Sequence, residues 1–191
     1  MHGEHGVYVP ELIFGHLLTS SNYDDSERKV TGGRNGYGAK LANIFSDEFT
    51  VETSDAERGL DFSQTFRHNM QEKDEPIITP LKGKKAKASA SSSSSRSRGP
   101  GTDYTRITFK PDLARFKMDS LDDDTVALLK KRAYDIAGAT HKSVGVYLNG
   151  EKLPVNDFKS YVDLYIQDDE APRMFESCGD RWEVCVSLSD G

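Results

Sequence analysis

A glycine-rich run constrains this chain more than any other feature of its sequence. The run spans residues 33–40, reads Gly-Arg-Asn-Gly-Tyr-Gly-Ala-Lys, and is preceded by a further glycine, Gly32. Glycine has no Cβ, so successive backbone N–H groups can turn toward an anion that approaches the chain closely. Lys40 and Arg34 would add charge-assisted hydrogen bonds to phosphate oxygens. The run therefore predicts a loop that binds nucleotide phosphates, and the alternative left open by the glycines alone is a flexible connection.

The residues around the last glycine decide which kind of phosphate site the loop can form. Leu41, Ile44 and Phe45 follow at helical spacing, so a helix should begin within or just after the glycines and point its positive end at the anion. The P-loop pattern needs lysine directly after its last glycine and then Ser or Thr, but here Ala39 intervenes and Leu41 follows the lysine. The dinucleotide-binding pattern needs a third glycine where this chain has Leu41. Both familiar patterns are therefore excluded.

Length and composition indicate one ordinary domain with a piece of a second. The net charge of −6 argues against strong nucleic-acid binding by this piece alone. A run of about eighteen apolar residues, which a membrane span needs, is absent, and residues 1–6 lack the pattern of a signal peptide. Cys178 and Cys185 fit neither a disulfide framework nor a zinc site, so we expect two reduced thiols in an intracellular protein.

The segments on both sides of the loop predict a helix and a set of strands. Residues 9–18 read as a helix with Pro10 in its first turn, where the missing N–H costs nothing. Strand composition recurs at residues 49–53, 62–66 and 104–109. The first two strands form a hairpin with Arg58 and Gly59 in the turn. The third strand alternates and places Thr105, Ile107 and Phe109 on one side.

Residues 82–101 differ in kind from the rest of the chain. They combine basic residues with a serine run from Ser91 to Ser95 and contain no large apolar side chain. Such a segment cannot bury enough apolar surface to offset the entropy lost on ordering. We therefore expect a disordered insertion between two strands, and the alternative for its basic residues is a nuclear-localisation or nucleic-acid-binding patch.

The second half of the chain predicts two helices, a hairpin and a last strand. Residues 121–138 are the clearest helix, ended by Gly138, with a core stripe of Val126, Leu129, Ala133 and Ile136. A strand at residues 144–148 is closed by Asn149-Gly150, a hairpin signal, and residues 158–166 carry one apolar helical face. Residues 182–188 read as a strand without a partner. This order favours an α+β sandwich with helices on one face of a mixed, largely antiparallel sheet.

Several motifs, taken in order, closely resemble the ATPase domain of eukaryotic type II DNA topoisomerases, a branch of the GHKL group of ATPases. The likeness starts with Ser20-Ser21-Asn22-Tyr23-Asp24-Asp25, the spacer to residues 30–33 and the glycine run. It continues at residues 43–46, 49–53, 132–138, 148–150, 160–163 and 181–185. It covers nearly the whole chain outside residues 82–101, and it implies a two-layer GHKL sandwich in which the glycine loop is part of a lid over ATP.

The resemblance also implies which residues bind ATP. Ser20, Ser21 and Asn22 would contact the sugar and phosphates, and Thr105 would lie near the adenine. The triphosphate would be wrapped, mostly by backbone amides, by Gly33, Arg34, Asn35, Gly36, Tyr37, Gly38, Ala39 and Lys40. The alternative for residues 20–22 is a turn that ends a helix, and the alternative for Lys40 is a solvated helix surface.

The family's glutamate general base and magnesium-holding asparagine lie on a helix upstream of the residues that match residues 7–10. Glu4 and Glu11 are the only carboxylates nearby, and neither fits that pattern. We therefore assign no catalytic and no metal-ligating residue. Because a general base contributes roughly two to four powers of ten in rate, we expect the chain by itself to hydrolyse ATP negligibly.

For the protein as a whole, the resemblance implies an ATP- and Mg²⁺-dependent homodimer that passes one DNA duplex through another in the nucleus, with no membrane partner. Residues 1–175 would be a partial ATPase domain and residues 176–191 the start of the transducer domain. Two alternatives stay open. One is a truncated, non-catalytic nucleotide-binding or interaction protein. The other is a further GHKL member such as a chaperone, against which residues 34–38 and 182–185 argue.

Overall fold

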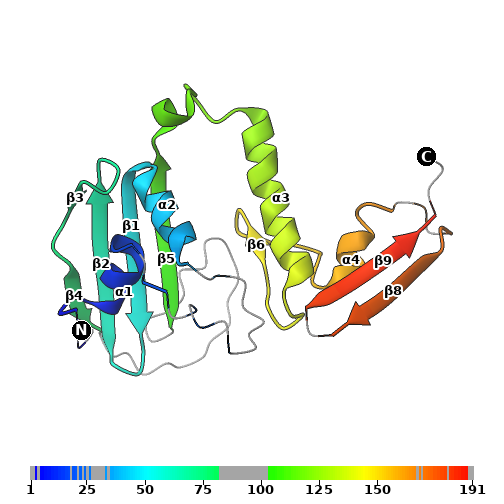
Figure 1. Cartoon of the computed structure of the whole chain (residues 1–191), viewed down its shortest axis with the longest axis horizontal. Coiled ribbons are helices and arrows are strands. Elements are labelled where there is room, and N and C mark those ends of the chain that lie inside the picture. Colours follow the sequence, from blue (N-terminus) through cyan, green and yellow to red (C-terminus); the bar gives the residue numbers. More distant parts are fainter. Residues whose placement is uncertain are drawn as a thin grey trace. The chain divides into compact units, whose positions relative to one another are not determined.

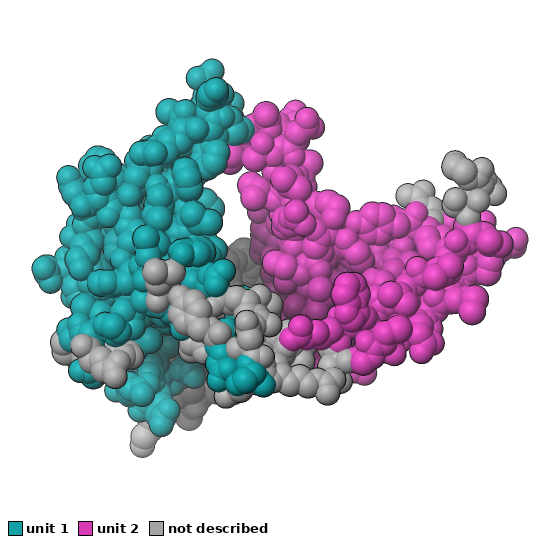
Figure 2. Space-filling view, viewed as in Figure 1, with its two compact units in different colours: residues 1–92, 97–120 teal, residues 93–96, 121–191 magenta. Residues whose placement is uncertain are grey.

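The computed structural model describes residues 3, 5–17, 19–20, 22, 24, 26, 33, 35–81, 103–166, 168, 170–179 and 181–188. The chain divides into two compact units, residues 1–92 with 97–120 and residues 93–96 with 121–191 (Figure 2). The predicted insertion at residues 82–101 lies outside the described residues. The transducer boundary after residue 175 stays a prediction.

The first unit is built on an antiparallel sheet (Figure 1). Its strands are β1 (Ser46–Asp55), β2 (Leu60–Arg67), β3 (Glu72–Lys73), β4 (Ile77–Pro80) and β5 (Tyr104–Pro111). They lie in the order β3-β2-β1-β5, and β4 also pairs with β2. In the β1–β2 hairpin Phe49 lies opposite Phe66, and Arg58 and Gly59 are in the turn. The predicted hairpin and third strand are thus confirmed.

Two helices cover one face of this sheet, α1 (Val9–Gly15) and α2 (Tyr37–Ile44), and the short 3-10 helix η1 (Leu113–Phe116) follows β5 (Figure 1). Because side chains alternate along a strand, the buried side chains of β1 and β2 share that face. They are Phe49, Val51, Phe62 and Phe66, and Phe14 of α1 and Ala42 of α2 pack against them. This arrangement confirms the α+β class, with helices on one face of a largely antiparallel sheet.

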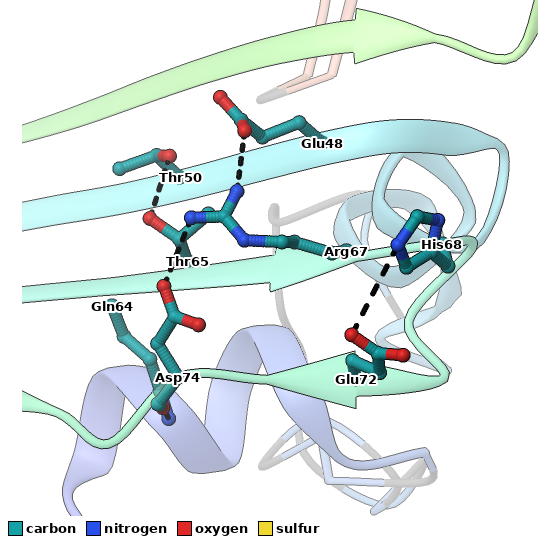
Figure 3. A network of polar contacts seen from close by, with 8 residues as sticks. All are labelled: Glu48, Thr50, Gln64, Thr65, Arg67, His68, Glu72 and Asp74. Atoms are coloured by element: carbon teal, nitrogen blue, oxygen red, sulfur yellow. Dashed lines mark hydrogen bonds and ion pairs between the residues drawn. The ribbon is translucent and has the colours of Figure 1, made fainter.

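The opposite face of β1 and β2 is polar (Figure 3). The hydroxyls of Thr50 and Thr65 are 3.0 Å apart, and Arg67 pairs with Glu48 and, at 3.0 Å, with Asp74. These groups are largely exposed, so each ion pair contributes little to stability. The helices therefore pack on the apolar face of β1 and β2 and not on this polar one.

The second unit contains α3 (Asp123–Ala139), β6 (Tyr147–Leu148), β7 (Glu151–Lys152), α4 (Phe158–Val162), β8 (Arg173–Cys178) and β9 (Trp182–Ser187). The carboxylate of Asp122 caps α3 by accepting a hydrogen bond from the backbone N–H of Thr125 at 2.7 Å. Asp157 and Ser160 form a capping box that starts α4. Both helices thus begin where short polar side chains satisfy their first N–H groups.

The predicted core stripe of α3 is wrong at two of its four positions, because Leu129 and Ile136 are more than half exposed. The buried residues of this helix are Ala137 and Gly138, and Ala137 belongs to a core with Leu153 and Val155. Small residues let α4 approach closely, a contact that hydrophobic periodicity does not reveal. Gly138 also does not end α3, which continues through Ala139.

The last strand does have a partner, which corrects the expectation of an unpaired edge. β8 pairs with β9 in antiparallel register from Arg173 opposite Ser187 to Cys178 opposite Trp182. The residues of β8 are mixed polar and apolar, so their composition gives a weak strand signal. Cys178 and Cys185 are free thiols on these strands. Among the described residues, no helix has the length and apolar character to cross a membrane.

Candidate functional site

The glycine loop and the segment that follows α1 border a pocket of about 580 Å³ in the first unit. Its described lining residues are Ile13, Thr19, Ser20, Gly33, Asn35, Gly36, Tyr37, Gly38, Ala39 and Lys40. Two segments that are separate in the sequence thus meet at one site. The volume falls in the range typical of small-molecule pockets, about 300–1,000 Å³.

The start of α2 faces this pocket. Its N-cap residue is Gly36, in the left-handed conformation with φ of 67°, and no side chain caps the helix. The first N–H groups of an α-helix have no partner within the helix and carry its positive end. Since Tyr37, Gly38 and Ala39 all line the pocket, the start of α2 offers backbone donors for an anion there.

Lys40 is the charged group of the pocket. Its side chain is buried, with the residue only 2% exposed, and its ammonium Nζ donates to the hydroxyl Oγ1 of Thr19 at 2.8 Å. Burial lowers the pKa of Lys40 below its ordinary value. A solvated Lys40 on the helix surface, the alternative at the sequence level, is therefore wrong. Within the part of the chain that the structure describes, no carboxylate pairs with this ammonium.

A buried ammonium with one neutral partner is short of hydrogen-bond acceptors, because a lysine has three N–H donors. An anion in the pocket would supply both the missing charge and the missing acceptors. The chemistry of this site therefore fits a phosphate group.

Gly36 keeps the space beside Lys40 open. A Cβ at position 36 would lie 3.1 Å from Nζ of Lys40 and 3.5 Å from the backbone N of Ser20. Its φ of +67° is also a conformation that residues with a Cβ rarely adopt. Glycine at this position thus allows both the loop conformation and close approach to the ammonium.

The end of α1 fixes the position of α2. The last carbonyls of a helix lack hydrogen-bond partners within the helix. At the end of α1, side chains donate hydrogen bonds to such carbonyls. Asn43, which is fully buried, donates from Nδ2 to the carbonyl of Phe14 at 3.1 Å. The hydroxyl of Thr19 lies 3.2 Å from the carbonyls of both Leu12 and His16 and donates its one proton to either of them. The hydrogen bond between Lys40 and Thr19 therefore lies where the end of α1 packs against α2.

Ser20 and Asn22, two of the predicted ATP-binding residues, are joined by a hydrogen bond, and Asn22 also contacts the glycine loop. Ser20 lines the pocket, and its Oγ accepts a hydrogen bond from the backbone N–H of Asn22 at 3.1 Å. The side chain of Asn22 donates to the carbonyl of Gly33 at 2.9 Å. Asn22 thus contacts the loop, while the hydroxyl of Ser20 closes a turn of the kind expected as the alternative.

Of the remaining three predicted residues, the structure describes one, Thr105. Ser21 and Arg34 lie outside the described residues. Thr105 lies on β5 opposite Thr53, is exposed, and is not among the described residues that line the pocket. The assignments of all the predicted ATP-binding residues stay predictions.

Sequence reasoning missed Ile13 and Thr19, which both line the pocket. Thr19 directly precedes the predicted Ser20, but its role depends on where α1 ends. The sequence predicted that helix through residue 18, whereas it ends at Gly15. An earlier helix end, which the short polar run from Thr19 onward allows, would have made Thr19 a candidate partner for the last carbonyls.

The buried carboxylate of α1 is held outside this pocket. Glu11 on α1 is buried and pairs with Lys73 at 2.7 Å, and it is not a lining residue of the pocket. Among the described residues, no group of three or more His, Cys, Asp or Glu side chains could hold a metal ion.

Comparisons with known proteins point to one family. DNA topoisomerase 2 of Arabidopsis thaliana is 52% identical over 198 aligned residues, which cover all of this chain and 12% of that protein. No protein-family model matches the chain.

Solved structures agree with this relation. The ATPase region of Saccharomyces cerevisiae topoisomerase II matches 99% of this chain with a TM-score of 0.82 and 47% identity, and the match covers 46% of that structure. The ATPase and transducer domains of DNA topoisomerase II from Balamuthia mandrillaris match 98% of this chain at 53% identity and a TM-score of 0.81, over 43% of that structure. The chain thus spans under half of these structures and about an eighth of the curated relative. Over its whole length, the chain is homologous to the ATPase region of eukaryotic type II DNA topoisomerases.

Proposed function

We propose that this chain is the phosphate-binding part of an ATP-driven type II DNA topoisomerase. The observation that carries the proposal is the buried Lys40 ammonium, which lies beside the uncapped start of α2 in a pocket lined by the glycine loop. Backbone N–H groups of the loop and of residues 37–39 would bind the phosphate oxygens of ATP, and Lys40 would neutralise part of their charge. Ser20 and Asn22 would hold the neighbouring turn in place.

For the chain tested alone, we propose nucleotide capture rather than hydrolysis. None of the described residues that line the pocket carries a carboxylate or an imidazole, the side chains that most often activate water. Mg²⁺ would enter with ATP, and we assign no residue of this chain as its ligand. For the whole protein we propose a nuclear homodimer that acts on DNA. The family relation supports this part of the proposal, while the chain's own net charge of −6 argues against DNA binding by this piece.

The proposal predicts that the chain binds a non-hydrolysable ATP analogue and that Lys40→Ala weakens this binding at least tenfold, because charge-assisted hydrogen bonds contribute about 1.5–3 kcal/mol. Isothermal titration of both proteins measures the effect. Lys130→Ala, which removes a lysine exposed on α3, is the matched control and should bind like the wild type. A wild-type chain that does not bind the analogue, or a Lys40→Ala variant that binds it equally well, overturns the proposal.

A further inference from the structure

We propose that the hydroxyl of Thr19 is the positioning group that holds the Lys40 ammonium in the phosphate pocket. The inference rests on the proposed function and assigns a role to a residue outside the glycine loop. Thr19 lines the same pocket, and its Oγ1 lies 2.8 Å from Nζ of Lys40.

The hydrogen-bond geometry fixes which way the hydroxyl points. A threonine hydroxyl has one proton to donate, and carbonyl oxygens only accept. The carbonyls of Leu12 and His16 both lie 3.2 Å from Oγ1 of Thr19. The proton therefore points toward one of these carbonyls, and a lone pair faces the ammonium of Lys40. A chain of hydrogen bonds runs from Lys40 through Thr19 to the end of α1.

These hydrogen bonds matter because the ammonium of Lys40 has one hydrogen-bond acceptor among the described residues. Lysine carries its charge on a flexible four-carbon stem, and a buried charge without a partner is costly. Without the Thr19 hydroxyl, the ammonium would lose its described acceptor and leave the position next to Gly36. Thr19 would thus act through Lys40 rather than through the nucleotide.

The conservative substitutions separate the hydroxyl from the shape of the side chain. Thr19→Val keeps the branched shape and removes the hydroxyl, whereas Thr19→Ser keeps the hydroxyl and removes the methyl group. We expect Thr19→Val to weaken binding of the non-hydrolysable ATP analogue roughly tenfold to a hundredfold, as the loss of a buried bond to a charged group would. Thr19→Ser should bind within about threefold of the wild type, since the expected bond to Lys40 is kept.

A double-mutant cycle distinguishes positioning from a general structural role. If Thr19 acts through Lys40, Thr19→Val should change affinity little in a Lys40→Ala background, so the two effects are not additive. Circular dichroism of each variant shows whether the fold is kept, and Thr19→Ala provides the same comparison if the valine variant does not fold.

Failure of the positioning role of Thr19 and failure of the proposed function would give different results. Wild-type affinity in Thr19→Val, equal losses in the valine and serine variants, or fully additive losses with Lys40→Ala would each overturn the role of Thr19 while leaving nucleotide binding intact. A wild-type chain that fails to bind the analogue overturns the proposed function itself, and the positioning role with it.

Discussion

At the scale of single residues, the site depends on positions where a side chain is absent as much as on positions where one is present. Gly36 combines a positive φ with a hypothetical Cβ only 3.1 Å from Nζ of Lys40. Gly38, two residues later within α2, has open space where its Cβ would be. Two glycines of one loop are thus under different constraints, which sequence alone does not distinguish.

This difference predicts opposite effects of two alanine substitutions. Gly36→Ala should destabilise the chain by about 1–2 kcal/mol, the cost of placing a residue with a Cβ in the left-handed region. It should also weaken binding of the ATP analogue, since the new Cβ crowds Lys40. Gly38→Ala should stabilise the free chain by roughly 0.5–1 kcal/mol through helix propensity. Urea unfolding of the wild type and the two variants measures both changes in stability. Equal stability of the two variants would contradict the different constraints assigned to Gly36 and Gly38.

At the scale of elements, the α3–α4 contact is made by a glycine and a tyrosine. A Cβ on Gly138 would lie 2.5 Å from Cγ of Tyr161 and 2.6 Å from its Cβ, which cannot swing away. The phenol of Tyr161 donates to the carboxylate of Asp135 at 2.6 Å, and the ammonium of Lys131 donates to the same oxygen at 2.7 Å. The two helices are therefore joined by close packing and by a polar cluster beside it.

The close packing predicts that Gly138→Ala destabilises the chain. Overpacking typically costs about 1–3 kcal/mol, and the better helix propensity of alanine offsets up to about 1 kcal/mol of this. We expect a net loss measurable by thermal unfolding. Tyr161→Ala in the same protein should relieve the clash, so the double variant should lose less than the sum of the two single variants. Additive losses would show that the two side chains do not meet.

The polar cluster predicts that Tyr161 ionises at a higher pH than an ordinary tyrosine. Its hydrogen bonds to Asp135 and then to Tyr165 raise the pKa of Tyr161 to about 12. Because this folded pKa is above the unfolded value near 10, the stabilising contribution is complete below about pH 10 and is lost as the pH rises through about 12. In a phenolate absorbance titration, Tyr161→Phe should remove the last phase. A last phase that persists in Tyr161→Phe assigns it elsewhere.

The contribution of the carboxylate of Asp135 to stability changes with pH in the opposite direction. The hydrogen bond from Lys131, followed by that from Tyr161, lowers the pKa of Asp135 to about 2. Its contribution is therefore present above the unfolded value near 4 and is lost as the pH falls toward about 2. The α3–α4 contact should thus be strongest across the wide range between these two limits.

At the scale of the whole molecule, prediction from sequence succeeded where local pattern and fold agree. The β1–β2 hairpin and β5 follow from strand composition, alternation and turn residues, and the start of α2 within the glycine run follows from the helical spacing of the residues after it. Prediction failed for β8, whose composition is mixed, and for the buried face of α3, which depends on Tyr161. The burial of Lys40 could not be predicted either, because it depends on how the end of α1 packs on α2.

The burial of Lys40 also decides whether its charge is desolvated when the chain folds or when a ligand binds. The ammonium is shielded from water by the chain's own residues. Its desolvation therefore belongs to the folding of the chain, and a bound phosphate meets a cation that has little water left to release. Binding would then raise the stability of the folded chain by mass action, with a larger effect the tighter the nucleotide is held. A loop of this kind is a preorganised receptor, whose specificity for anions is established as the chain folds.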